Sequence, residues 1–335
     1  MIITVKKFDY LLIGFQFVSY IRDQRVPLNN RRKNNYISSS IRSFNLLAQT
    51  YWLLFSCFQR KVKKKKMVIH NLLTAMNAKI MGSGKETLVL AHGYGVDQSI
   101  WDKELPLLAD HYQVVVFDWC FSGAVKDPGL YDAAKYSTYD AFADDLICLL
   151  EEMKLKSSVF VGHSMSGMIG CIASIKRPDL FHKLILVGTT PRCTNSEDYE
   201  GGFELSGVEE IFSSIKSNYE QWTSSFAALV VDPSDPESVE KLAKSLKRMR
   251  PEVAFTLAKT VFLIDYRDML EKVTTPCCII QTKNDIVVPN SVPKYMQNKI
   301  KGETKVEIID TEGHFPQLTA HHKFVEVIDA SLADK

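Results

Sequence analysis

Six short apolar runs recur in the second part of this chain, and they limit the folds that it can adopt. They are rich in β-branched residues and do not alternate with polar ones, which is typical of strands buried on both faces. Helical patterns such as 138–154 and 166–177 lie between them. This alternation predicts an α/β fold with a mostly parallel central sheet and helices on both faces. The predicted strands span residues 87–91, 113–118, 158–162, 183–188, 276–281 and 305–310.

One long interval, between residues 188 and 276, interrupts the alternation. It contains no convincing strand, and its helical stretches 207–231, 238–249 and 251–270 are separated by prolines. An insertion at this point would lie at the carboxyl edge of the sheet, where open α/β sheets bind their ligands. We therefore predict a helical lid over about residues 193–262.

The first 66 residues differ from the rest in charge. They hold 14 Lys and Arg against 2 Asp and Glu, a net of +12, whereas the whole chain has a net charge of +2. The apolar stretch 10–20 is too short to span a membrane, although it could belong to a targeting peptide, and Lys61–Lys66 could be a nuclear-localisation or anionic-surface patch. We interpret 1–66 as a poorly ordered extension or as upstream sequence translated from a mispredicted start. The compact domain is expected over 67–335.

The charge of that domain and the cysteines limit the classes of function. The domain is acidic, with a net of −10, so neither nucleic-acid binding nor membrane association is expected. The cysteines lack a C-x-x-C pair, which favours reduced thiols in the cytoplasm and nucleus. No phosphate-binding loop or zinc pattern is present, so no metal or organic cofactor is expected.

The stretch VFVGHSMSGMIG (159–170) places Ser164 between a predicted strand and a predicted helix. This context is that of a nucleophile elbow, G-x-S-x-G, in which small neighbours let the strand and the helix approach. Here the fifth position is Ser166, and a glycine follows only at Gly167. Because serine is only slightly larger than glycine, Ser166 is a tolerable replacement. Alone, the motif leaves open that Ser164 is merely a helix cap.

Two later loops supply partners for Ser164 in the chain order Ser, Asp, His. Asp285 and His314 each follow a predicted strand, so both would lie at the same sheet edge as Ser164. His314 would take the serine proton, and Asp285 would orient and stabilise the imidazolium. Asp118 is a rival acid, but it precedes the serine in the chain.

The backbone N–H groups of Tyr94 and Met165 are the expected oxyanion donors. Tyr94 lies in the loop after the first predicted strand, and Met165 follows the nucleophile. Two nearby histidines, His92 and His163, are expected to brace the site and to take no part in the chemistry. Large apolar side chains of the lid are expected to line a pocket for a small hydrophobic ester or lactone.

Several motifs resemble the plant α/β-hydrolases that perceive strigolactones and karrikins. They are AHGYGVDQSIWD, VGHSMSGMIGCIASIKRPDLF, SEDYEGGFE and EGHFPQL, and the resemblance runs from about Met67 to the C-terminus. The segment FDWCFSGAVKDPGLYD most resembles the DWARF14-LIKE2-type branch. The resemblance implies a triad of Ser164, Asp285 and His314, a four-helix lid, and slow cleavage of butenolide lactones that can leave a fragment on the histidine. It also implies a lid that recruits an F-box protein and transcriptional repressors. We expect a monomer.

Three positions depart from the pattern of this family and bear on the ligand. Tyr94 stands where Phe is usual, Cys193 stands where a larger residue is common, and apolar residues follow Asp285. We expect a serine hydrolase of small butenolide-type lactones; the alternatives are a ligand-gated signalling protein with incidental hydrolysis and a general carboxylesterase. The expected pocket residues are His163, Tyr94, Cys193, Ile211, Trp222, Phe226, Val261, Phe262 and Val287.

Overall fold

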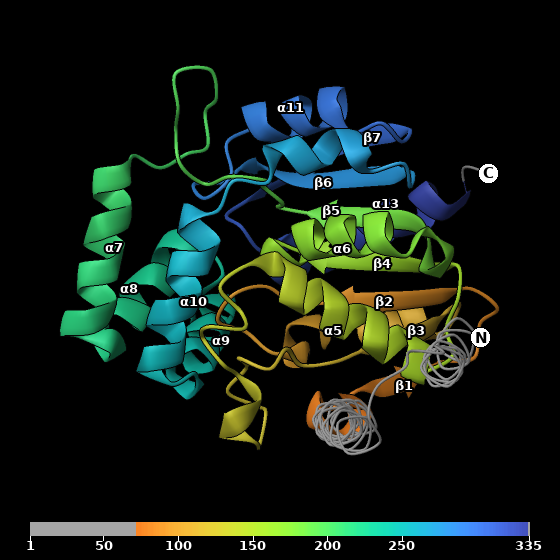
Figure 1. Ribbon diagram of the computed structural model, residues 1–335, viewed down its shortest axis with the longest axis horizontal. Coiled ribbons are helices and arrows are strands. Elements are labelled where there is room, and N and C mark those ends of the chain that lie inside the picture. The colour runs from red at the N-terminus through yellow and green to blue at the C-terminus, as the bar shows by residue number, and fades with distance from the viewer. Residues whose placement is uncertain (1–71, 334–335) are drawn as a thin grey trace, which may run out of the picture. The chain divides into compact units, whose positions relative to one another are not determined.

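A seven-stranded sheet forms the centre of the computed structural model, which describes residues 72–333 (Figure 1). The strand order is β1-β3-β2-β4-β5-β6-β7, and every neighbouring pair is parallel except β1 with β3. The six predicted strands are confirmed. The strands are β1 (Lys79–Met81), β2 (Thr87–Ala91), β3 (Gln113–Val116), β4 (Ser158–His163), β5 (Phe181–Val187), β6 (Cys277–Asn284) and β7 (Thr304–Glu312).

The first strand, β1, was not predicted from the sequence. All three of its residues are exposed, so it carries no apolar run to mark it. The proposed basic extension, 1–66, lies outside the described residues, as does Cys57. The six described cysteines form no disulfide with one another.

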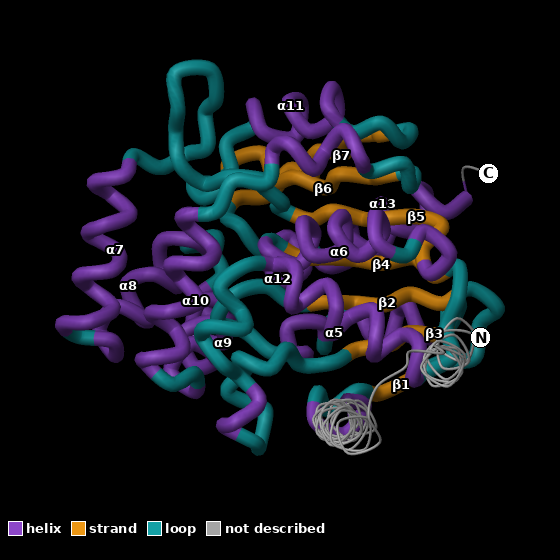
Figure 2. The backbone as a smooth tube through the Cα atoms, in the orientation of Figure 1, coloured by secondary structure: helices purple, strands orange, loops and turns teal. Residues whose placement is uncertain are grey.

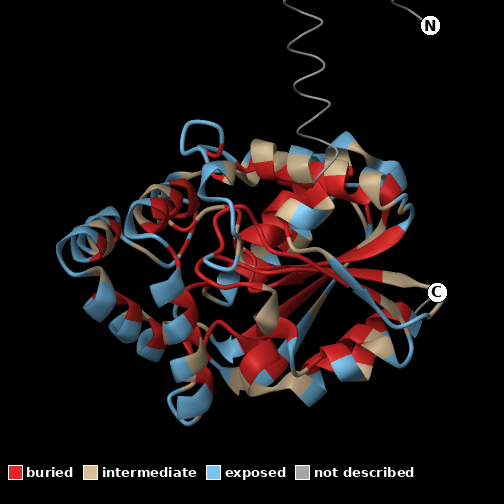
Figure 3. Cartoon of the chain, turned by 90° about the horizontal axis from the view of Figure 1, so that it is seen from below, coloured by how far each residue is buried: buried red, intermediate tan, exposed pale blue. Residues whose placement is uncertain are grey.

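Helices cover both faces of the sheet, as the alternating pattern predicts (Figure 2). Figure 3 shows buried strands between these two layers, and all six residues of the central strand β4 are buried. No helix in the described part of the chain is long and apolar enough to cross a bilayer. The helices outside the lid are α3 (Leu72–Ala75), α4 (Leu105–Ala109), α5 (Tyr139–Glu152), α6 (Met165–Lys176), α11 (Ser291–Lys299), α12 (Pro316–Thr319) and α13 (His321–Ala333), with the short 3₁₀ helices η1 (Gln98–Trp101), η2 (Pro128–Leu130), η3 (Pro178–Leu180) and η4 (Arg267–Lys272).

Four helices fill the interval between β5 and β6, beyond the carboxyl ends of the strands (Figure 1). The single helical stretch predicted over 207–231 is wrong, because the chain breaks at Asn218. Its side chain accepts a hydrogen bond from the Gln221 N–H at 3.1 Å and so caps a new helix. The lid helices are α7 (Leu205–Ser217), α8 (Tyr219–Val230), α9 (Pro236–Arg248) and α10 (Pro251–Leu263).

Backbone atoms join the end of α8 to the loop that follows β7. The His314 N–H donates to the Val230 carbonyl at 2.7 Å, and Val231 forms an isolated antiparallel bridge with Gly313. Gly313 has a φ of +82°, and a Cβ at this position would lie 2.8 Å from the Val230 oxygen. The loop therefore needs a glycine here to approach the lid this closely.

One carboxyl group in the body, that of Glu104, is buried without a partner. Its side chain is fully buried, and neither oxygen has a hydrogen-bond partner among the described residues. Burial raises the pKa of Glu104 to about 8. The folded protein therefore binds this proton more tightly than the unfolded chain, so the free energy of unfolding falls as pH rises towards 8.

Glu104→Gln is expected to remove this pH dependence. The amide carries no charge in either state, so the stability of the variant relative to the parent should rise by about 1.4 kcal/mol per pH unit between about pH 5 and 8. Urea unfolding at several pH values measures this difference. Glu209→Gln, on the exposed surface of α7, is the matched control. An unchanged pH slope in Glu104→Gln would contradict the prediction.

Candidate active site

Three loops at the carboxyl edge of the sheet bring Ser164, His314 and Asp285 together. Ser164 follows β4, Asp285 follows β6, and His314 follows β7. The Ser164 hydroxyl lies 2.9 Å from His314 Nε2, and His314 Nδ1 lies 2.7 Å from Asp285 Oδ2. A carboxylate can only accept, so Nδ1–H donates to Asp285, and Nε2 is left as the acceptor for the serine proton. This is the geometry of an activated serine nucleophile.

The backbone at Ser164 is strained in the way that an elbow requires. Its φ is +56° and its ψ is −122°, outside the common regions for a residue with a side chain. A Cβ at Gly162 would lie 2.7 Å from the Gly167 nitrogen, and a Cβ at Gly167 would lie 1.9 Å from Thr189 Oγ1. Gly162 therefore lets β4 approach the start of α6, and Gly167 lets α6 approach Thr189, just after β5. Ser166 lies in the first turn of α6, where the sequence placed it.

Asp285 is held in its ionised form. Burial alone would raise its pKa, but the charge of His314 and hydrogen bonds outweigh burial and lower the pKa. The N–H groups of Val287 and Val288 donate to Oδ1 at 2.8 and 3.2 Å. Gln281 Nε2 donates to Oδ2 at 3.1 Å. Gln281 was not singled out from the sequence, because its position inside a predicted strand gave no sign of a polar role.

The rival acid, Asp118, does not reach His314. Its carboxylate accepts hydrogen bonds from Gln98 and Asn77, and its Oδ1 lies 3.9 Å from His92 Nε2. The structure therefore places Asp285, and not Asp118, beside the histidine of the triad.

The two other histidines near the elbow brace the site. His163 Nε2–H donates to the His314 carbonyl at 2.9 Å. Burial lowers the pKa of His163 to about 3, and burial also lowers the pKa of His92. Both rings are therefore neutral, and neither bonds to Ser164.

The loop after β2 lies directly against the elbow. A Cβ at Gly93 would lie 2.8 Å from His163 Nδ1 and 3.1 Å from the Ser164 Cβ. Next to it, the Tyr94 hydroxyl donates to the Ala254 carbonyl of α10 at 2.9 Å. The hydroxyl that distinguishes Tyr94 from phenylalanine thus ties this loop to the lid.

A small cavity of about 40 Å³ opens over the triad. Most of the predicted pocket residues line it, but Ile211 and Trp222 do not. Besides the triad members Ser164 and His314, the lining residues are Tyr94, Tyr139, His163, Met165, Thr190, Cys193, Phe226, Val261, Phe262, Val287 and Phe315.

The two predicted residues outside the lining have other packing roles. Trp222 stacks between Tyr219 and Phe226, with ring centroids 5.7 and 5.0 Å away, so it supports the cavity wall from behind. Ile211 lies on α7, which packs against the other lid helices α8 and α10. Tyr139 was missed because it begins α5, a helix of the body, whereas the large apolar wall residues were sought in the lid. Its ring stacks on Tyr266 at 5.4 Å.

The described residues contain no group of three or more His, Cys, Asp or Glu side chains that could hold a metal ion. Most of the cavity walls are apolar, and besides Ser164 and His314 the lining residues with polar side-chain atoms are Tyr94, Tyr139, His163, Thr190 and Cys193. The arrangement can carry out acyl transfer through a serine ester, with the N–H groups around Ser164 as oxyanion donors.

Known proteins resemble this chain in sequence and in structure. A family model for the α/β hydrolase fold matches residues 86–320. Strigolactone esterase D14 of Arabidopsis thaliana is 43% identical over 263 residues, which cover 78% of this chain and 98% of the relative. Karrikin insensitive 2 receptor CA of Petunia hybrida is 43% identical over 255 residues, which cover 76% of this chain and 94% of the receptor. The solved structure of a hydrolase, olei00960 from Oleispira antarctica, superposes with a TM-score of 0.76 at 31% identity, covering 80% of this chain and 98% of the other.

Proposed function

Since this chain belongs to the α/β-hydrolase family, in the group that contains the strigolactone esterases and karrikin receptors, we propose that it binds and slowly hydrolyses small butenolide-type lactones. The observation that carries the proposal is the hydrogen-bonded chain from Ser164 through His314 to Asp285, which opens into a small apolar cavity. The same chain of bonds, together with the likeness to strigolactone esterases, supports action on an ester bond.

In the proposed reaction, Ser164 Oγ attacks the lactone carbonyl while His314 Nε2 takes its proton. The N–H groups of Tyr94 and Met165 stabilise the oxyanion, and ionised Asp285 stabilises the imidazolium. The ring C–O bond then breaks, and the proton on His314 passes to the leaving oxygen. Water, deprotonated by His314, hydrolyses the serine ester and regenerates the enzyme.

The cavity supports a compact substrate and a slow reaction. Its volume of about 40 Å³ is far below the roughly 300–1,000 Å³ usual for ligand sites, so binding requires the walls to move apart. Three wall residues, Phe226, Val261 and Phe262, belong to the lid helices α8 and α10. Lid movement would therefore precede chemistry and limit turnover.

Comparing kcat/KM for a strigolactone analogue with kcat/KM for a simple aryl ester tests the substrate class. We expect the butenolide-containing analogue to be cleaved with the higher kcat/KM. Intact mass spectrometry of a rapidly quenched reaction should detect the acyl intermediate, which peptide mapping should assign to Ser164. Each enantiomer is assayed separately. Fast cleavage of aryl esters without any cleavage of butenolides would instead identify a general carboxylesterase.

A second candidate, a ligand-gated signalling protein, is favoured by apolar side chains on the outside of the lid. Leu205, Leu229 and Leu263 are 56%, 56% and 50% exposed. We propose that this surface recruits an F-box protein and transcriptional repressors in the cytoplasm and nucleus, with hydrolysis as an accompanying reaction. Ligand-dependent pull-down of such partners would support it, and pull-down that is unchanged by ligand would count against it.

A further inference from the structure

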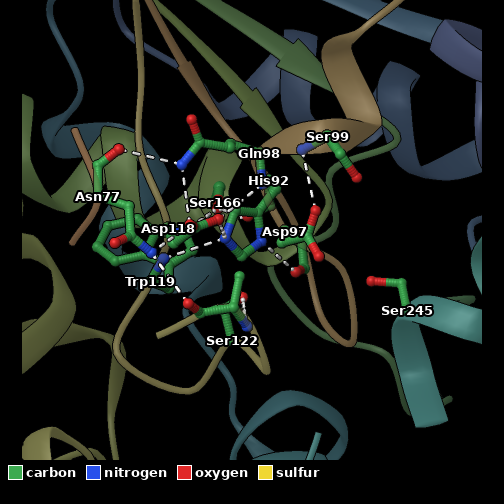
Figure 4. Close-up of polar contacts among 12 residues, drawn as sticks. Asn77, His92, Asp97, Gln98, Ser99, Asp118, Trp119, Ser122, Ser166 and Ser245 are labelled. Atoms are coloured by element: carbon green, nitrogen blue, oxygen red, sulfur yellow. Dashed lines mark hydrogen bonds and ion pairs between the residues drawn. The ribbon is translucent and has the colours of Figure 1, made fainter. Parts of the chain in front are cut away.

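A buried hydrogen-bond network joins the first turn of α6 to the loop that carries Tyr94 (Figure 4). The Ser166 hydroxyl is fully buried. It donates to the His92 carbonyl at 2.5 Å and accepts from Trp119 Nε1–H at 2.9 Å. The same indole N–H lies 3.0 Å from the His92 carbonyl. Two donors from different parts of the chain therefore hold one carbonyl of the loop.

The ring of His92 is held as firmly as its carbonyl. Its Nε2 accepts from the Trp119 backbone N–H at 3.0 Å, which requires this nitrogen to be unprotonated. The proton is then on Nδ1, which donates to the Gly93 carbonyl at 2.9 Å. A neutral ring with this tautomer satisfies both contacts at once.

Asp118 holds the far end of the same loop, as Figure 4 shows. Its Oδ1 accepts from the Gln98 backbone N–H at 2.8 Å. Its Oδ2 accepts from the side-chain amides of Gln98 and Asn77, both at 2.8 Å. The loop from His92 to Gln98 is thus fixed at both ends, with Tyr94 between them.

Ser166 connects this network to the reaction, because it lies beside the two proposed oxyanion donors. Ser166 directly follows Met165, whose N–H is one proposed oxyanion donor, and it holds the carbonyl two residues before Tyr94, whose N–H is the other. Oxyanion donors act only when they lie about 2.7–3.1 Å from the developing charge, so their mutual spacing matters. A single serine hydroxyl connects the two peptide segments that must keep this spacing.

We propose that Ser166 is a positioning residue, whose hydroxyl holds the loop of Tyr94 at the distance from Met165 that lets both N–H groups reach one oxyanion. The inference rests on the proposed function, because it assigns those two groups as donors. Glycine at this position would fit the elbow sterically but would leave the His92 carbonyl to Trp119 alone.

Ser166→Ala removes the hydroxyl and tests this role. We expect kcat to fall by about 10-fold with KM within about 2-fold, since a displaced donor should cost less than the 10²–10³-fold caused by loss of one donor. The affinity for an alkyl boronic acid, which forms a tetrahedral adduct on Ser164, should fall by a similar factor. Binding of the intact substrate, measured in a Ser164→Ala background with and without Ser166→Ala, should not change.

Ser174→Ala is the matched control on the same helix. Ser174 is also buried, but its hydroxyl donates to the Cys171 carbonyl within α6 at 2.8 Å. Ser174→Ala should keep the parent kcat and boronate affinity. Ser166→Cys has a side chain of the same shape, slightly larger and with a weaker donor, so it should show the same loss without a cavity. It replaces Ser166→Ala if that variant is unstable.

The outcomes separate this inference from the proposed function. Parent-like kcat and boronate affinity in Ser166→Cys and Ser166→Ala would overturn the positioning role and leave the hydrolase proposal intact. Equal losses in the Ser166 and Ser174 variants would overturn it too, because they would reflect general destabilisation of α6. Turnover that survives Ser164→Ala would contradict the proposed function itself.

Discussion

Ser164→Ala is expected to lower kcat for a strigolactone analogue by at least about 10³-fold, because it removes the atom that forms the covalent bond to the substrate. The hydroxyl lies 2.9 Å from His314 Nε2, and alanine leaves that nitrogen without its partner. Binding should survive, since the apolar walls of the cavity remain. Single-turnover kinetics and a ligand-induced thermal shift measure the two effects separately.

The control for this variant is Ser174→Ala, which removes a buried hydroxyl outside the site. Mass spectrometry of Ser164→Ala should also show no acyl intermediate, because the oxygen that would carry it is absent. A parent-like rate in Ser164→Ala would mean that another group attacks the carbonyl.

Asp285→Asn is expected to reduce kcat by about 10²–10⁴-fold, with little change in fold. The reason is that the substitution moves the proton of the neutral His314 ring from Nδ1 to Nε2. Oδ1 of the aspartate accepts from Val287 and Val288 N–H, and the amide oxygen of asparagine can keep these contacts. Its NH₂ group then faces His314 Nδ1, which must accept. The proton moves to Nε2, and that nitrogen can no longer take the proton of Ser164.

Comparing pH–rate profiles of parent and Asp285→Asn over the range in which both remain folded tests this explanation. The loss should appear in kcat and persist across that range, since the asparagine has no charge to regain. Asp310→Asn is the control. Asp310 is exposed near the end of β7 that leads to His314, and its carboxylate pairs with exposed Lys283. Retention of more than half of the activity in Asp285→Asn would contradict the triad.

The sheet and the triad were predictable because their signals are local. Each of the six apolar runs is a parallel strand, and all but β7 are mostly buried. The polar residues that follow the strands gather at one edge. Ser164, Asp285 and His314 could be grouped from the sequence because each follows a predicted parallel strand, and the carboxyl ends of such strands lie at one edge. The exposed strand β1 lacked any such signal. The break at Asn218 carried a signal that was overlooked, since asparagine is a strong helix cap.

The cavity could not be predicted to the same degree, because its walls depend on how the lid helices pack. Trp222 and Tyr139 illustrate the difference. Trp222 lies in the lid and is large and apolar, yet it packs behind Phe226. Tyr139 begins a helix of the body and still reaches the cavity. Neither position can be read from apolar periodicity.

The irregular elbow shows a subtler limit of the sequence. Ser166 was interpreted as a small residue that stands in for a glycine. In the structure, Gly167 meets the tightest steric demand, because a Cβ there would collide with Thr189. Ser166 instead forms two buried hydrogen bonds to groups 47 and 74 residues away along the chain. Residue size suggested that the motif was tolerable but gave no indication of those partners.

The joint between α8 and the histidine loop leaves the side chains of these lid helices free to vary at this point. Its contacts are backbone hydrogen bonds at Val230 and His314 and a bridge between Val231 and Gly313, so lid side chains can change without altering them. The one side-chain requirement at the joint is the absence of a Cβ at Gly313. Selection could therefore replace the cavity walls contributed by α8 and α10 while the nucleophile, base and acid stay in register. A transplanted lid would also have to keep an arginine at the place of Arg248, which pairs with Asp97 in the loop that carries Tyr94, and a carbonyl at the place of Ala254 for the Tyr94 hydroxyl.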